Sequence, residues 1–282
     1  MSLTIKFYDV EHGSCTHIIT PNGKHFLVDI GTKSGSSICR HLKSKYFPYQ
    51  GSIDYLIITH PHIDHIADLE NLYTYNIKPY TLRRPRGAFP LQIVPTDTIA
   101  QTALKRRANE MDAEYNSAVM VDPELPNNNG GVEISFFDPY VSDHEKSDVN
   151  NHSCVMVLEY AGFKTVLTGD NPSTKLIEML QQYSFRQSIA NATVLLAPHH
   201  GRDSDYCDEF VKAVNPLLTV FSDKPIQHET QAHSAQKYYT YTRGVKWNGN
   251  DRYIFTTRSD GTITFVFKDD GNWSIDTSST EY

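Results

Sequence analysis

Short apolar runs alternate with turn residues along most of the chain and predict a mixed α/β fold. Apolar runs of four to eight residues bounded by Gly, Pro or Asn favour strands, whereas apolar residues three or four positions apart favour helices. The predicted strands cover residues 3–7, 16–19, 25–28, 54–59, 132–137, 153–160, 164–168, 193–197 and 218–221. The predicted helices cover residues 36–46, 64–73, 96–116, 173–182, 204–214 and 234–242.

Two further segments have distinct patterns. Residues 121–131 (VDPELPNNNGG) are rich in Pro, Asn and Gly and predict a loop. Residues 253–267 (YIFTTRSDGTITFVF) predict a hairpin that turns at 259–261. No repeat, linker or low-complexity stretch interrupts the chain, so we expect one domain over residues 1–282, built from two sheets covered by helices.

Composition narrows the function classes. The 282 residues carry a net charge of -7 and are 39% hydrophobic. Proteins that bind duplex DNA through charge alone usually have a positive excess, so this class is excluded for the surface as a whole. No apolar run approaches the roughly 18 residues of a membrane-spanning helix, and the first residues lack the pattern of a signal peptide. We expect a cytoplasmic protein with no membrane partner. Its four cysteines form no CxxC pair, which argues against a thiolate zinc site.

The motif THPHIDH places four candidate metal ligands directly after a predicted buried strand. His60 and His62 lie two residues apart in an extended segment, so both rings can point the same way. Asp64 and His65 lie where the predicted helix begins and can face a second point nearby. Imidazole nitrogens and carboxylate oxygens are zinc ligands, and two metals about 3.5–4 Å apart are a common hydrolytic arrangement.

Two more polar clusters follow predicted strands. Asp170 in VLTGDN offers a carboxylate that could bridge two metals, and Gly169 before it allows close backbone approach. In LLAPHHG, one of His199 and His200 could complete the second metal site while the other contacts substrate or donates a proton. Three such clusters at strand ends favour a metal centre over unrelated polar loops.

The order of these motifs resembles the metallo-β-lactamase fold superfamily of metal-dependent hydrolases. The resemblance extends over about residues 3–267 and is closer to the hydrolase domain of bacterial competence (DNA-internalisation) proteins and to related phosphorylcholine esterases. It includes FYDVEHGSCTHII, FLVDIGT, THPHIDHIAD, NNHSCVMVLEY, LLAPHHG and YIFTTRSDGTITF in the same order. It implies a four-layer αββα sandwich. The segment at about residues 77–131 matches no motif of the family and is expected to form a variable wall of the cleft.

The resemblance also implies roles for single residues. His60 and His62 would hold the first metal, Asp64 and His65 the second, and Asp170 would bridge them. His199 would complete the second site, with His200 near the substrate and His233 as a further catalytic histidine. His228 could take the place of His233, and Asp29 would support the ligand loop from behind.

The chain departs from the family at the third nitrogen ligand of the first metal. That region reads Asn150-Asn151-His152-Ser153 here, in which His152 is a candidate ligand and Asn150 and Ser153 match an Asn-x-x-Ser pattern. A weaker first site would admit manganese beside zinc, so we expect two divalent ions with zinc favoured. His12 also replaces a glutamine of the relatives.

Three functions fit these residues. The leading hypothesis is a phosphodiesterase or nuclease that uses a hydroxide activated by two metals, with Asp64, His200 and His233 as catalytic residues. The expected partner is a phosphate-containing substrate: a nucleotide, a cyclic nucleotide or a single-stranded nucleic acid. Basic residues at 83, 84, 86 and 105–107 favour it, because guanidinium groups suit phosphate oxygens. The alternatives are an acyl or amide hydrolase (lactonase, thioesterase or β-lactamase-like) and a non-catalytic binding module.

Overall fold

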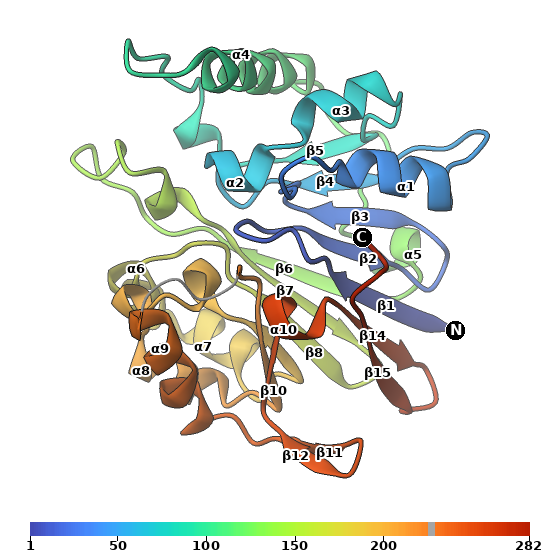
Figure 1. Cartoon of the computed structure of the whole chain (residues 1–282), viewed down its shortest axis with the longest axis vertical. Helices are drawn as coiled ribbons and strands as arrows, with labels where there is room; N and C mark the ends of the chain where they lie inside the picture. Colours follow the sequence, from blue (N-terminus) through green and yellow to red (C-terminus); the bar gives the residue numbers. More distant parts are fainter. Residues whose placement is uncertain (225–228) are drawn as a thin grey trace.

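Two β-sheets packed face to face form the centre of the molecule, and helices cover both outer faces (Figure 1). The computed structural model describes the backbone of residues 1–224 and 229–282, and the side chains of residues 1–224 and 234–282. This arrangement confirms the predicted αββα sandwich. Within the described residues, no helix is long and apolar enough to cross a membrane.

The first sheet has seven strands in the order β15-β14-β1-β2-β3-β4-β5. The first four of these strands along the chain begin and end close to the residues predicted from the apolar runs. The bounds are β1 Ser2–Phe7, β2 Thr16–Ile19, β3 His25–Val28, β4 Tyr55–Ile57, β5 Thr81–Arg83, β14 Thr262–Lys268 and β15 Trp273–Ser278. β3, β4 and β5 run parallel, so their carboxyl ends meet at one edge.

The second sheet has six strands in the order β13-β10-β9-β8-β7-β6. Its strands are β6 Glu133–Phe137, β7 Val155–Tyr160, β8 Phe163–Leu167, β9 Val194–Leu196, β10 Leu218–Phe221 and β13 Ile254–Thr256. The parallel strands β8, β9 and β10 also bring their carboxyl ends together. A separate two-stranded ribbon comprises β11 Val245–Trp247 and β12 Asn250–Arg252.

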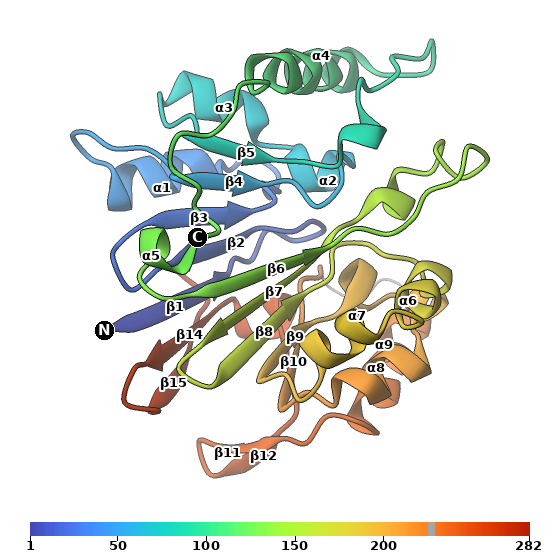
Figure 2. The same cartoon turned by 180° about the vertical axis from the view of Figure 1, so that it is seen from behind.

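Helices of the N-terminal half cover the first sheet, and helices of the C-terminal half cover the second (Figure 2). The first group is α1 Ile38–Tyr46, α2 Ile63–Ile66, α3 Leu69–Thr74 and α4 Ile99–Glu114, with the short α5 Pro126–Asn129 inside the predicted loop. The second group is α6 Ser173–Met179, α7 Tyr183–Ile189, α8 Asp208–Val214 and α9 Glu229–Tyr239, and the short α10 Thr257–Asp260 precedes β14. Each helical layer has its own apolar cluster against the sheet.

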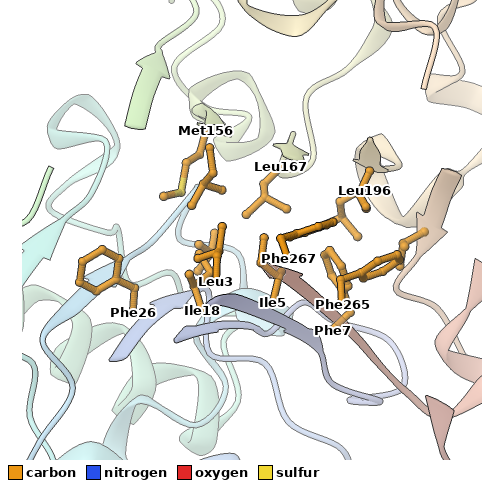
Figure 3. Close-up of a cluster of buried hydrophobic side chains, with 14 of the residues drawn as sticks. Leu3, Ile5, Phe7, Ile18, Phe26, Met156, Leu167, Leu196, Phe265 and Phe267 are labelled. Atoms are coloured by element: carbon orange, nitrogen blue, oxygen red, sulfur yellow. The ribbon is translucent and has the colours of Figure 1, made fainter. Parts of the chain in front are cut away.

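The central core lies between the two sheets (Figure 3). Ile5 and Phe7 of β1 are buried at alternate positions, as the period of two in a strand requires. Met156 and Leu167 approach them from the second sheet (Figure 3). This core fixes how the carboxyl edges of the two sheets meet, and the candidate ligands lie at that junction.

The predicted hairpin at 253–267 is wrong. β13 pairs in parallel with β10 in the second sheet, whereas β14 pairs with β1 in the first. Between them, α10 ends at Gly261 with φ 70, where an added Cβ would lie 2.3 Å from the Ser278 carbonyl oxygen. The segment therefore crosses from one sheet to the other. The single predicted helix at 64–73 is likewise divided at Asp68, because the Asp68 backbone N–H donates to the Ile30 carbonyl oxygen at 3.0 Å instead of to a carbonyl within the helix.

Candidate metal centre

The first cluster occupies the loop between β4 and α2. The backbone of His62 is extended (φ -73, ψ 152) and the helix begins at Ile63. The chain therefore turns between the pair His60 and His62 and the pair Asp64 and His65. His60 and His65 are fully buried, whereas Asp64 is 18% and His62 47% exposed. The loop thus presents two candidate ligands to the interior and two toward solvent.

Asp170 lies beside this loop, with its carboxylate oxygens 3.1 Å from His65 Nε2 and 3.8 Å from His60 Nε2. It follows Gly169, whose φ is 54 and where a Cβ would lie 2.9 Å from the Thr59 Cβ. The Asp170 backbone N–H donates to the Ser153 hydroxyl at 3.2 Å, which anchors the carboxylate on the second sheet. Close backbone approach at the glycine therefore brings the two strand ends together.

His199 and His200 follow β9 in a strained turn. Both residues have positive φ (48 and 57), and both side chains are buried. His200 donates from Nδ1 to the Ser222 carbonyl oxygen at 2.8 Å, which leaves Nε2 facing Asp64 and Asp170 at 3.4 Å each. A carbonyl partner on one ring nitrogen orients the other nitrogen for a ligand.

These side chains form two groups of possible ligands that share one residue. Ligand atoms of His60, His62 and Asp170, the first ligand group, lie within 4.8 Å of one another. The same holds for those of Asp64, His65, Asp170 and His200, the second ligand group. Asp170 belongs to both groups and is 2% exposed. A shared buried carboxylate between two nitrogen-rich groups has the chemistry of a bridged pair of divalent cations.

Unpartnered atoms support the fit to metal ions. Buried His60 Nε2 and Asp170 Oδ2 have no hydrogen-bond partner among the described residues, although such atoms are normally satisfied. His60 Nε2 lies 3.8 Å from Asp170 Oδ2. Metal ligation would satisfy both atoms at once, since it uses the lone pairs that point into this space.

The electrostatics of the cluster favour added positive charge. Burial opposes a charge on His200, but the carboxylates of Asp170 and Asp64 raise its pKa to about 9. Burial likewise opposes a charge on His65, yet Asp170 and Asp29 raise its pKa well above the usual value. Without metal, protons supply the positive charge that these carboxylates require; bound cations would replace them.

Asp29 holds the ligand loop from behind. Its Oδ2 lies 2.7 Å from His65 Nδ1, and its carboxylate also accepts from the backbone N–H and hydroxyl of Thr59 at 2.8 Å each. His65 Nδ1 is thereby the donor, and Nε2 faces Asp170 Oδ1 at 3.1 Å. The supporting position predicted for Asp29 is where the structure places it.

The two histidines after β9 take different places from those the resemblance implied. His200, expected near the substrate, lies in the group with Asp64 and His65. His199 Nδ1 lies 2.7 Å from the Asp205 carboxylate, and its Nε2 lies 3.5 Å from Asp170 Oδ2. His199 is therefore adjacent to the shared carboxylate but outside both ligand groups.

His152 lies apart from both groups. It lines a cleft of about 550 Å³ together with Arg83, Arg86 and Lys146, and its Nε2 lies 3.4 Å from the Lys146 carbonyl oxygen. The side chain of His233 and the whole of His228 lie outside the described residues. These two remain candidates on sequence alone.

The basic residues of the variable segment are largely neutralised. Within the described structure, the ion pairs join Arg83 to Asp138, Arg84 to Asp112, Lys105 to Asp97 and Arg107 to Glu70. A guanidinium already bound to a carboxylate has fewer donors for a phosphate. These residues therefore give less support to a phosphate site than their sequence suggested.

His12 lies beside Asp64 of the second ligand group, and Arg202 lies beside His12. His12 Nε2 lies 3.3 Å from Asp64 Oδ2 and 3.3 Å from Arg202 Nη2. Burial, reinforced by the charge of His200, lowers the pKa of His12 to about 4. Sequence analysis singled out His12 but missed Arg202 and Asp205; the only signal was their place just after the HHG motif.

Comparisons with known proteins identify the family and the fold. The family model "Metallo-beta-lactamase superfamily" matches residues 8–216, and no curated protein matches the chain. Among solved structures, yeast PDE1 has a TM-score of 0.51 at 11% identity, with 90% of this chain and 98% of that chain covered.

CmlA, a diiron β-hydroxylase from Streptomyces venezuelae, has a TM-score of 0.49 at 14% identity, covering 93% of this chain and 53% of that chain. An isothiocyanate hydrolase from Delia radicum gut bacteria has a TM-score of 0.45 at 13% identity, covering 96% and 99%. The family match includes the His60–His65 loop, Asp170 and His200. The chain therefore belongs to the metallo-beta-lactamase superfamily, as a metal-dependent hydrolase that uses divalent ions.

Proposed function

We propose that this hydrolase is a phosphodiesterase or nuclease with two metals, zinc in preference to manganese, and that it is functionally closest to the hydrolase domain of competence proteins. The supporting observation is the pair of ligand groups that share Asp170, combined with the Asn150-x-x-Ser153 motif. Ser153 accepts the hydrogen bond of the Asp170 backbone N–H, so this motif holds the backbone of the residue that carries the shared carboxylate. A phosphate-containing substrate suits the site because two divalent ions would outweigh the charges of Asp64 and Asp170.

Divalent ions in such a pair would lower the pKa of a coordinated water and offset charge on the phosphoryl oxygens. The protein's own part is to hold the ligands. Asp29 fixes His65 so that Nε2 faces the shared carboxylate, and the Ser222 carbonyl does the same for His200. In this proposal His200 is a metal ligand, and His233 stays the candidate that protonates the leaving oxygen.

A second candidate is ester or amide hydrolysis. The same ligand groups serve attack on a carbonyl. The neutralised arginines of the variable segment favour this candidate. A non-catalytic binding module has less support, because each group around Asp170 still offers three or four ligand atoms.

Turnover of matched chromogenic substrates separates these candidates. We expect zinc- or manganese-loaded protein to hydrolyse bis-p-nitrophenyl phosphate and to lose this activity with EDTA. Asp64→Ala should lower turnover by about 10³-fold or more, because the second ligand group loses one of its two carboxylates. Asp276→Ala is the matched control, since Asp276 is an exposed carboxylate on the edge strand β15 with no ion pair in the described structure. Turnover of p-nitrophenyl acetate or a lactone alone would refute the phosphodiesterase proposal.

A further inference from the structure

Arg202 lies beside the metal centre with most of its donors unused. Its side chain is exposed, and in the described structure its guanidinium makes one hydrogen bond, from Nη2 to His12 Nε2 at 3.3 Å. A guanidinium has five N–H donors, so four remain for another acceptor. His12 Nε2 is also 3.3 Å from Asp64 Oδ2, which places this cation next to the second ligand group.

The acids that follow Arg202 in the chain are engaged elsewhere. Asp203 Oδ1 lies 2.6 Å from Lys237 Nζ, and Asp205 Oδ2 lies 2.7 Å from His199 Nδ1. Arg83 and Arg84, by contrast, each contact a carboxylate. Within the described residues, Arg202 is thus a cation at the metal centre that has no carboxylate within 4 Å.

The backbone fixes where this guanidinium starts. His199, His200 and Gly201 have φ of 48, 57 and 74, and a Cβ on Gly201 would lie 2.7 Å from the Phe221 ring. The Arg202 N–H donates to the His199 carbonyl oxygen at 3.0 Å, which closes the turn. The turn that places His200 in the second ligand group therefore also places Arg202 next to that group.

We propose that Arg202 binds a phosphoryl oxygen of the substrate at the Asp64 side of the metal centre, and that His12 positions the guanidinium. Arginine can only donate, so His12 Nε2 accepts and its ring proton lies on Nδ1. The planar fork of the guanidinium matches two phosphoryl oxygens. His12 is a positioning residue; Arg202 contacts the substrate. This inference deepens the proposed function, and a binding probe tests it separately.

The primary test is calorimetric binding of phenylphosphonate to the zinc-loaded protein. We expect Arg202→Gln to raise the Kd at least tenfold, as expected for loss of a hydrogen bond between charged groups. Arg106→Gln is the matched control, because Arg106 is an exposed arginine on α4 with no ion pair in the described structure. Elemental analysis should find the same zinc content in both variants, which excludes damage to the ligand groups.

The role of His12 needs its own pair of variants. His12→Phe removes the acceptor and should weaken phenylphosphonate binding, and His12→Gln, which restores an acceptor, should recover part of the lost affinity.

Equal Kd values for wild-type protein and Arg202→Gln would overturn the proposal. A tenfold loss of phosphonate binding without any turnover of bis-p-nitrophenyl phosphate would retain the Arg202 site and refute the proposed phosphodiesterase.

Discussion

Asp29→Asn tests whether the metal centre depends on a buried residue that touches no metal position. The carboxylate accepts three hydrogen bonds, from His65 Nδ1 at 2.7 Å and from the backbone and hydroxyl of Thr59 at 2.8 Å each. Asparagine has the same shape and tolerates the φ of 60 at this position. The substitution therefore changes the hydrogen bonding and leaves the packing and backbone in place.

An amide in this place has a donor where one oxygen was. If its nitrogen faces His65, the ring must accept at Nδ1 and carry its proton on Nε2, the atom that faces Asp170 at 3.1 Å. If its nitrogen faces Thr59, two donors oppose each other in a buried site. Loss of such a supporting partner typically weakens metal binding 10- to 100-fold, or about 1.4–2.7 kcal/mol.

Competition with a chromogenic chelator measures this effect directly. We expect the second zinc equivalent of Asp29→Asn to bind 10- to 100-fold more weakly than in wild-type protein. Asp68→Asn is the control: Asp68 is equally buried and bonds Ser37 and Cys39, but it contacts no candidate ligand by its side chain. It should lower the unfolding free energy and leave zinc affinity unchanged. Equal zinc affinities in Asp29→Asn and wild type would show that the Asp29 carboxylate does not support the metal centre.

Three further outcomes follow from the structure. Gly31→Ala should lower both thermal stability and zinc affinity, because a Cβ there would lie 2.5 Å from the Asp64 carbonyl oxygen, whereas Gly23→Ala meets nothing within 4 Å and should cost only about 1–2 kcal/mol for its positive φ. Burial, reinforced by the charge of His25, lowers the pKa of His17 well below its usual 6.5. The unfolded chain then binds a proton that the folded chain refuses, so metal-free stability should fall as pH drops below about 6.5, by up to about 1.4 kcal/mol per pH unit. Urea unfolding in EDTA at several pH values measures this effect. The unfolding free energy of His17→Gln should depend less steeply on pH than that of wild type, and an equal pH dependence would contradict this. Zinc at 1,000 times its Kd should stabilise the protein by about 4 kcal/mol per site, and a melting temperature unaffected by EDTA would contradict metal binding.

The elements predicted from sequence are those with strong local patterns. β1, β2 and β3 are bounded by turns, and their burial alternates or is continuous as the apolar runs indicate. α7 Tyr183–Ile189 was missed because its N-cap residue, Gln182, makes no side-chain capping bond and Phe185 and Ile189 are its only buried positions. Weak local signals of this kind depend on tertiary packing.

The wrong hairpin has a different cause. The segment around Ser259 and Gly261 has turn residues between two apolar runs, which is typical of a hairpin. Whether two adjacent strands pair is decided by their partners, and here β10 and β1 lie in different sheets. Sequence patterns define strands well but carry little information about which strands they meet.

In the candidate site, too, the sequence reveals local features but not those that depend on distant partners. The THPHIDH loop and Asp170 could be identified because the ligand types lie close in sequence or follow an apolar strand. The different places of His199 and His200 depend on a turn with positive φ at both residues, and ring orientation within that turn is set by Ser222 and Asp205. Such partners lie far away in sequence or in the next loop, so spacing alone does not reveal them.

The central claim is that Asp170 is shared by two metal sites. Elemental analysis of wild-type protein purified without chelator, beside Asp170→Asn prepared in parallel, tests it most directly. We expect about two divalent ions per wild-type chain and fewer than one in Asp170→Asn, because both ligand groups lose their common carboxylate. Loss of a single ion, or an unchanged metal content in the variant, would contradict a shared carboxylate.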